Sequence, residues 1–264
     1  MIVFGAFTPH TPLLLESIGK EHTAKLGATR AALVKVSERM KAARVETLVM
    51  FSAHSGRREE AFTVNLYDPY GVDLSAFGDV TTQKTFHPDV ELIDRLQRAL
   101  RRAQHPMALC SSPALDYGTA VPLLVLFRDH GHAPRLVPFS YSGASAVDHF
   151  AFGQALFDVL AHSKKRIAVL ASGDLSHALS SNAPLGLRAE GKRFDTAVVN
   201  ALRRADAETL LALDPAVLEA SGECAYRPLL MLLGTLSSLN LSPKVLSYEA
   251  PFGVGFATAE FIVK

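Results

Sequence analysis

The strongest constraint on the fold of this chain is a regular alternation of short apolar, β-rich runs with longer segments of helical period. The predicted strands are Ile2–Phe7, Thr47–Ser52, Phe62–Leu66, Met107–Cys110, Arg135–Ser140, Arg166–Ala171, Lys244–Tyr248 and Gly255–Val263. The predicted helices are Glu21–Ala43, Asp89–Gln104, Thr119–Asp129, Ala146–Ala161, Arg188–Ala205, Ala207–Leu213 and Arg227–Leu239. This alternation predicts an α/β fold, an α/β/α sandwich with a largely parallel or mixed central sheet.

The chain reads as a single domain over residues 1–264. Its 264 residues are 48% hydrophobic, which is enough to bury one large core. The sequence contains neither an internal repeat nor a linker rich in Gly, Ser or Pro.

Composition excludes several classes of partner. The formal net charge is +1, so a nucleic-acid partner is not expected. No apolar run approaches the roughly 18 residues of a membrane span, and the first residues form a strand pattern rather than a basic leader. Two cysteines cannot form a disulfide framework, which favours a reducing compartment. The sequence therefore predicts a cytoplasmic protein.

Three histidines stand directly after predicted strands. His10 lies in "TPHTP", His54 in "FSAHSG" and His177 in "SGDLSH". In open α/β sheets, ligands bind outside the carboxyl ends of the strands. If these strands are parallel, the three imidazoles meet at one edge and form a shared site.

Glu223, in "SGECAYRP", is the candidate for an acidic ligand at this site. With two histidines it would complete a 2-His-1-carboxylate set, which leaves open positions on ferrous iron. The alternative is a carboxylate at the entry of a helix, stabilised by the amides of the first turn. Spacing alone does not choose between them.

An ordered series of short motifs runs along nearly the whole chain and resembles the class III extradiol ring-cleavage dioxygenases. The resemblance is closest to the catalytic B-subunit (LigB-type) branch, to which the Memo-like proteins are related. The motifs are "TPHTP", "SAHSG", "LDYGTAVPL", "SGDLSH", "GECAYRP" and "YEAPFGVGF".

The resemblance implies an enzyme that opens a catechol or aminophenol ring with O₂ beside the two metal-bound substituents. It implies that His10, His54 and Glu223 bind Fe(II), with Zn²⁺ as the alternative metal. His177 matches the family's acid/base histidine, and Asp174 is a candidate for a supporting hydrogen bond, for which helix capping is an equal explanation. Family members often form homodimers or pair with a small subunit.

Two residues depart from the family pattern. Tyr117 stands where many members have a histidine, and it would offer a hydroxyl to a substrate oxygen but move protons less readily. Cys224 follows Glu223 directly, and Memo-like relatives use a cysteine near this point. A carboxylate suits Fe(II) and O₂ chemistry, whereas a thiolate suits Zn²⁺ or Cu⁺, and we favour Glu223 as the third ligand.

Three other functions compete with ring cleavage. The first is a Memo-like metal-binding protein with a redox or regulatory role. The second is a zinc-dependent hydrolase that activates water, and the third is a scaffold without enzymatic activity.

Overall fold

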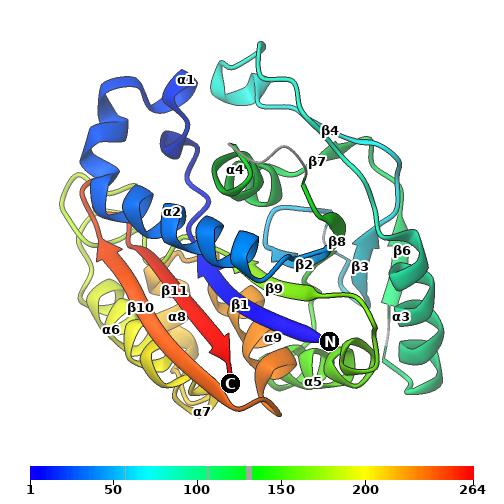
Figure 1. Cartoon of the computed structure of the whole chain (residues 1–264). Coiled ribbons are helices and arrows are strands. Elements are labelled where there is room, and N and C mark those ends of the chain that lie inside the picture. Colours follow the sequence, from blue (N-terminus) through cyan, green and yellow to red (C-terminus); the bar gives the residue numbers. More distant parts are fainter. Residues whose placement is uncertain (57, 106, 129–132) are drawn as a thin grey trace.

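The computed structural model describes residues 1–56, 58–105, 107–128 and 133–264. An eight-stranded sheet with the order β10-β11-β1-β9-β2-β8-β3-β6 forms its centre (Figure 1). These strands are β1 (Ile2–Thr8), β2 (Thr47–Ser52), β3 (Phe62–Asn65), β6 (Met107–Cys110), β8 (Arg135–Ser140), β9 (Ile167–Ser172), β10 (Leu241–Glu249) and β11 (Phe256–Val263).

The central sheet is mixed, as the sequence predicts. Its middle strands β1, β9, β2 and β8 run parallel to one another. On one side β11 pairs antiparallel with β1, and on the other β3 pairs antiparallel with β8. Every residue of β2 and β9 is buried, as expected for parallel strands that are covered on both faces.

Helices cover both faces of the sheet. On one face of the sheet, α2 contacts β1, β10 and β11, and α4 contacts β2 and β9. On the other face, α9 contacts β1, β2 and β9, and α5 packs on α9. Within the described residues, the helices are α1 (Glu16–Gly19), α2 (Gly27–Ala42), α3 (Val90–Arg102), α4 (Tyr117–Leu126), α5 (Ala146–Ala161), α6 (Ala189–Arg204), α7 (Ala207–Leu211), α8 (Pro215–Ser221) and α9 (Tyr226–Leu236). None of them has the length and apolarity needed to cross a membrane.

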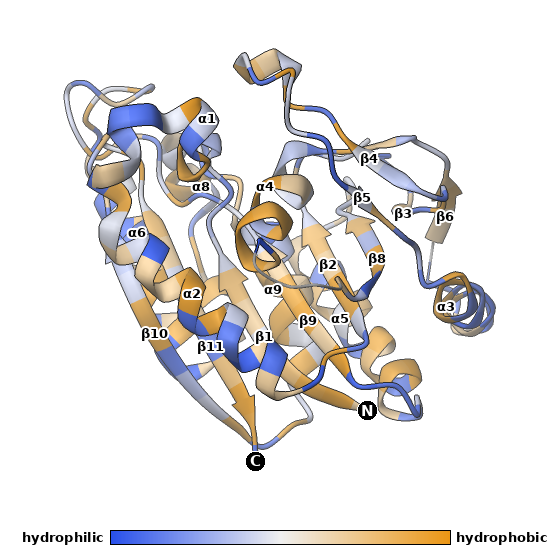
Figure 2. Ribbon diagram, turned by 45° about the horizontal axis from the view of Figure 1, so that its top comes forward, coloured by the Kyte–Doolittle hydropathy of each residue, from blue (hydrophilic) through white to orange (hydrophobic). Residues whose placement is uncertain are grey.

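Two hydrophobic clusters lie on opposite faces of the sheet, because successive strand residues point to opposite sides. In β2, Val49 and Phe51 belong to the cluster that includes α5 and α9. Leu48 and Met50 belong to the cluster that includes α2 and α4. Figure 2 shows the apolar strands in the middle of the sheet lying between helices.

The predicted elements of the main sheet are confirmed, and the differences concern short segments. The sequence pattern missed a small sheet of β5 (Thr85–Phe86), β4 (Tyr70–Val72) and β7 (Ala114–Leu115), as well as helices α1 and α8. The helix predicted from Glu21 begins as an α-helix only at Gly27, after a 3₁₀ segment over Lys20–Leu26. The predicted end of another helix, Asp129, lies outside the described residues.

Helices α5 and α9 approach each other through glycines. A Cβ atom on Gly153 would lie 2.3 Å from the carbonyl oxygen of Met231, and one on Gly234 would lie 2.1 Å from that of Phe150. Backbone therefore packs against backbone at this crossing. The close approach sets the position of α9, whose first turn adjoins the candidate site.

Candidate metal centre

Three adjacent parallel strands bring candidate side chains to one edge of the sheet. His10, Asp174 and His54 each lie two residues beyond the ends of β1, β9 and β2, respectively. The register places Thr8 beside Ser172, so the strand ends are level. Of the three histidines that the sequence predicts to share a site, the structure brings together His10 and His54, whereas His177 does not belong to their group of candidate ligands.

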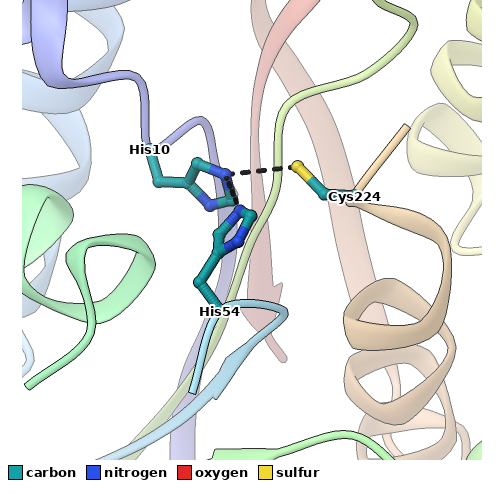
Figure 3. Close-up of side chains that lie close together, drawn as sticks. All are labelled: His10, His54 and Cys224. Atoms are coloured by element: carbon teal, nitrogen blue, oxygen red, sulfur yellow. Dashed lines mark hydrogen bonds between the residues drawn. The ribbon is translucent and has the colours of Figure 1, made fainter. Parts of the chain in front are cut away.

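The two imidazoles meet the thiol of Cys224. The Nε2 atoms of His10 and His54 are 3.1 Å apart, and Cys224 Sγ is 3.2 Å from His10 Nε2. One ligand atom from each of the three residues lies within 4.8 Å of the others. Figure 3 shows the three side chains converging from separate segments of the chain.

Tyr117 completes the cluster on the side of His54. Its hydroxyl is 2.8 Å from His54 Nε2, and the two rings are stacked with centroids 4.2 Å apart. Tyr117 is the first residue of α4, which is capped by the side chain of Asp116. The sequence placed Tyr117 among the functional residues, and the structure brings it into contact with one of the predicted ligands.

Hydrogen bonds orient the ring of His10. Its Nδ1 is 3.3 Å from Ser172 Oγ, and that hydroxyl donates its own proton to the Gly118 carbonyl at 2.6 Å. Ser172 therefore accepts from Nδ1, which leaves a lone pair on Nε2 directed at Cys224 and His54. Fixing a tautomer through the other ring nitrogen is how proteins prepare histidine to bind a metal.

The environment of the cluster keeps both imidazoles neutral. Burial, and secondarily the charge of His177, lowers the pKa of His10 to about 3. Partial burial and the charge of His10 lower the pKa of His54 to about 4. Burial and the nearby Asp174 raise the pKa of the Cys224 thiol well above its ordinary value. At neutral pH the cluster thus offers two neutral imidazoles and a protonated thiol.

These pKa values predict how metal affinity depends on pH. Both imidazoles are deprotonated above about pH 5, so they do not compete with protons, whereas Cys224 must release one proton to bind a metal. The affinity for Zn²⁺ should therefore rise about tenfold per pH unit between about pH 5 and about pH 8. Competition with a chelator of known pH dependence measures this slope. A flat profile would mean that no thiol proton is displaced.

The loop after β9 holds Cys224 in place. The Asp174 amide donates to Cys224 Sγ at 3.3 Å, and the Cys224 amide donates to the Asp174 carbonyl at 3.2 Å. Gly173 permits this approach, because a Cβ atom there would lie 2.4 Å from the Cα of Ala225. The glycine of "SGDLSH" therefore serves the contact between the two loops.

Glu223 does not belong to the group formed by His10, His54 and Cys224. One of its carboxylate oxygens accepts a hydrogen bond of 2.6 Å from the amide of Tyr226, the first residue of α9. This is the helix-entry role that the sequence left open as the alternative. Burial raises the pKa of Glu223 to about 7. Its carboxyl group is therefore only partly ionised at neutral pH, which also argues against Glu223 as the anionic metal ligand.

Asp174 and His177 lie in an irregular segment and not in a capped helix. The side chain of Asp174 accepts a 2.9 Å hydrogen bond from the His10 amide, so it positions the first histidine. Burial raises the pKa of Asp174. His177 lines a cavity of about 410 Å³ together with Asp174, and its buried Nδ1 has no hydrogen-bond partner among the described residues.

The donor set fits a metal ion. Two nitrogens at about 2.0 Å from a tetrahedral ion would be about 3.3 Å apart, close to the separation seen between His10 and His54. The lone pairs of two ring nitrogens and one sulfur repel one another at these short distances. Their close contact is therefore favourable only when protons or a cation lie between them. Thiolate and imidazole together suit Zn²⁺ and Cu⁺ better than the hard ions that prefer oxygen.

Comparison with known proteins agrees with this fold. Residues 4–259 match the family model described as the catalytic LigB subunit of aromatic ring-opening dioxygenase, so the chain belongs to the LigB family. The family resemblance expected from the ordered motifs is thus confirmed.

A curated relative and a solved structure are similar over nearly the whole chain. Protein CA_C1420 of Clostridium acetobutylicum is 23% identical over 257 residues, covering 94% of this chain and 55% of the relative, so the chain spans about half the length of that protein. The crystal structure of uncharacterized protein JW3007 from Escherichia coli K12 superimposes with a TM-score of 0.66 at 19% identity. It covers 98% of this chain and 99% of the other, which confirms the predicted fold.

Proposed function

We propose that this LigB-family protein binds one Zn²⁺ or Cu⁺ ion through His10, His54 and Cys224, in the manner of the Memo-like branch. Its role is then redox or regulatory and does not include opening of an aromatic ring. The observation that carries the proposal is the 3.2 Å contact between Cys224 Sγ and His10 Nε2. Glu223, in contrast, accepts a hydrogen bond from the Tyr226 amide at the start of α9.

The residues around the cluster have different roles in a site that holds such an ion. Ser172 and Asp174 orient His10 through its ring and its amide, respectively. Tyr117 stacks on His54 and offers a hydroxyl to whatever molecule approaches that side. When bound, the ion would supply Lewis acidity and, if it is copper, one-electron chemistry.

Fe(II)-dependent ring cleavage of a catechol or aminophenol is the second candidate function. It is favoured by membership of the LigB family and by His177, because its buried Nδ1, which has no partner in the described part of the chain, suits a proton acceptor. This function requires a Glu223 carboxylate oxygen to come within bonding reach of the ion held by His10 and His54 and to replace Cys224 as the anionic ligand.

Anaerobic reconstitution separates the two candidates. Protein loaded with Zn²⁺, Cu⁺ or Fe²⁺ is mixed with catechol and then with air. We expect one equivalent of Zn²⁺ or Cu⁺ to bind and no yellow ring-opened product to form with any of the three metals. Steady formation of that product by the iron-loaded protein would overturn the proposal in favour of ring cleavage.

His177 provides a further prediction. Because it lies outside the three-residue donor group, His177→Ala is expected to leave the metal stoichiometry unchanged, whereas His10→Ala is expected to abolish binding. Elemental analysis after dialysis against a weak chelator measures both variants. Loss of metal from His177→Ala would show that the ligands are wrongly assigned.

A further inference from the structure

A second cavity adjoins the proposed metal ligands His54 and Cys224. It has a volume of about 180 Å³ and is lined by His54, Cys224, Glu223, Tyr141 and Arg227, among others. A molecule of about six to ten heavy atoms would fit it while touching two of the proposed metal ligands. The lining of this cavity is more polar than the lining of the cavity beside His177. The latter includes the apolar side chains of Phe252, Val254 and Phe256.

Among the described residues that line this cavity, Arg227 is the one that carries a guanidinium. It lies in the first turn of α9, with its guanidinium carbon 5.4 Å from the ring centroid of Tyr141. None of the ion pairs among the described residues includes Arg227. A stacked guanidinium is pre-organised for a planar anion. Glu223 lines the same cavity and is close enough to interact with the charge of Arg227, but within the described part of the chain no carboxylate forms an ion pair with it.

The hydrogen bonding at the start of α9 indicates which class of anion could bind in this cavity. Glu223 accepts a hydrogen bond from the amide of Tyr226, the first residue of α9, so this donor is already used. A phosphate bound at a helix N-terminus depends on such free amides. A carboxylate needs only the fork of one arginine, which presents two parallel N–H donors.

We propose that this cavity binds a small carboxylate-bearing molecule, whose carboxylate pairs with Arg227 while its other end lies beside His54 and Cys224. The inference rests on the proposed metal site, because it places the ligand within reach of an ion held there. It identifies Arg227 as a determinant of ligand specificity in that site.

Calorimetric titration with succinate, its neutral isostere succinamide and inorganic phosphate tests the proposal, using metal-free and Zn²⁺-loaded protein. We expect succinate to bind at least about tenfold more tightly than succinamide or phosphate, the gain of one charge-assisted pair. Arg227→Gln should remove this advantage and leave the binding of succinamide unchanged. Arg203→Gln, an equal loss of charge on the exposed surface of α6, should have no effect.

Glu223→Gln is expected to have the opposite effect at pH 8, where the Glu223 carboxyl group, with a pKa of about 7, is ionised. It removes a negative charge that lines the same cavity and should therefore strengthen the binding of succinate. Equal affinity for succinate and succinamide, or tighter binding of phosphate, would overturn the proposal. Zn²⁺ stoichiometry is measured on the same samples. If Zn²⁺ binds normally but succinate is not preferred, the carboxylate site is wrong and the metal site stands; if Zn²⁺ does not bind, the proposed function fails.

Discussion

Cys224→Ala is expected to lower the affinity for Zn²⁺ about a thousandfold, which corresponds to ~4 kcal/mol. The thiolate is the only anionic donor in the group, and its removal leaves two neutral imidazoles to hold the ion. Glu223→Gln is expected to leave the affinity unchanged within about threefold, since the amide oxygen can still accept from Tyr226. Competition with a chromophoric chelator under reducing, anaerobic conditions measures both.

Cys110→Ala is the matched control for this comparison. Cys110 is the other free cysteine of the chain, at the end of β6, and its thiol donates to the Val64 carbonyl instead of joining the cluster. Its replacement should not change Zn²⁺ affinity. The reverse outcome, in which Glu223→Gln loses the metal and Cys224→Ala retains it, would restore the 2-His-1-carboxylate site that the sequence favoured.

Gly234→Ala is expected to lower the free energy of unfolding by about 3 kcal/mol, at the upper end of overpacking effects. The added methyl would lie 2.1 Å from the Phe150 carbonyl oxygen and 3.2 Å from the Cα of Gly153, so the helices α5 and α9 must separate. Alanine gains about 1 kcal/mol over glycine in a helix interior, but the clash with backbone outweighs that gain. Denaturant unfolding measures the difference.

Gly27→Ala is the control for the glycine prediction. Gly27 also lies in a helix, but a Cβ atom there would meet nothing within 4 Å. Its replacement should be neutral or slightly stabilising, because alanine restricts the unfolded chain. Equal stability of Gly234→Ala and the parent protein would show that the crossing of α5 and α9 is looser than the structure indicates.

The main sheet could be predicted from the sequence because its strands are continuous apolar runs that both faces of the sheet bury. Thr47–Ser52 and Arg135–Ser140 were predicted with the bounds observed for β2 and β8. The strands β5 and β7 have two residues each, which is too short for any periodicity to appear. Their pairing with β4 depends on contacts between distant segments.

Part of the candidate site could also be predicted. His10 and His54 converge because they follow level parallel strands, an inference that needs only the order of elements. The choice between Glu223 and Cys224 could not be made this way, because adjacent residues point in different directions and the backbone turn before α9 decides which one faces the histidines. The role of Ser172 in orienting His10 was likewise hidden, since serine at a strand end has many uses.

X-ray absorption spectroscopy of the Zn²⁺-loaded protein tests the central claim most directly, because it identifies the atoms bound to the ion. The account predicts one sulfur neighbour at about 2.3 Å together with imidazole nitrogens at about 2.0 Å, and loss of the sulfur contribution in Cys224→Ala. A spectrum of the parent protein with only nitrogen and oxygen neighbours would contradict it.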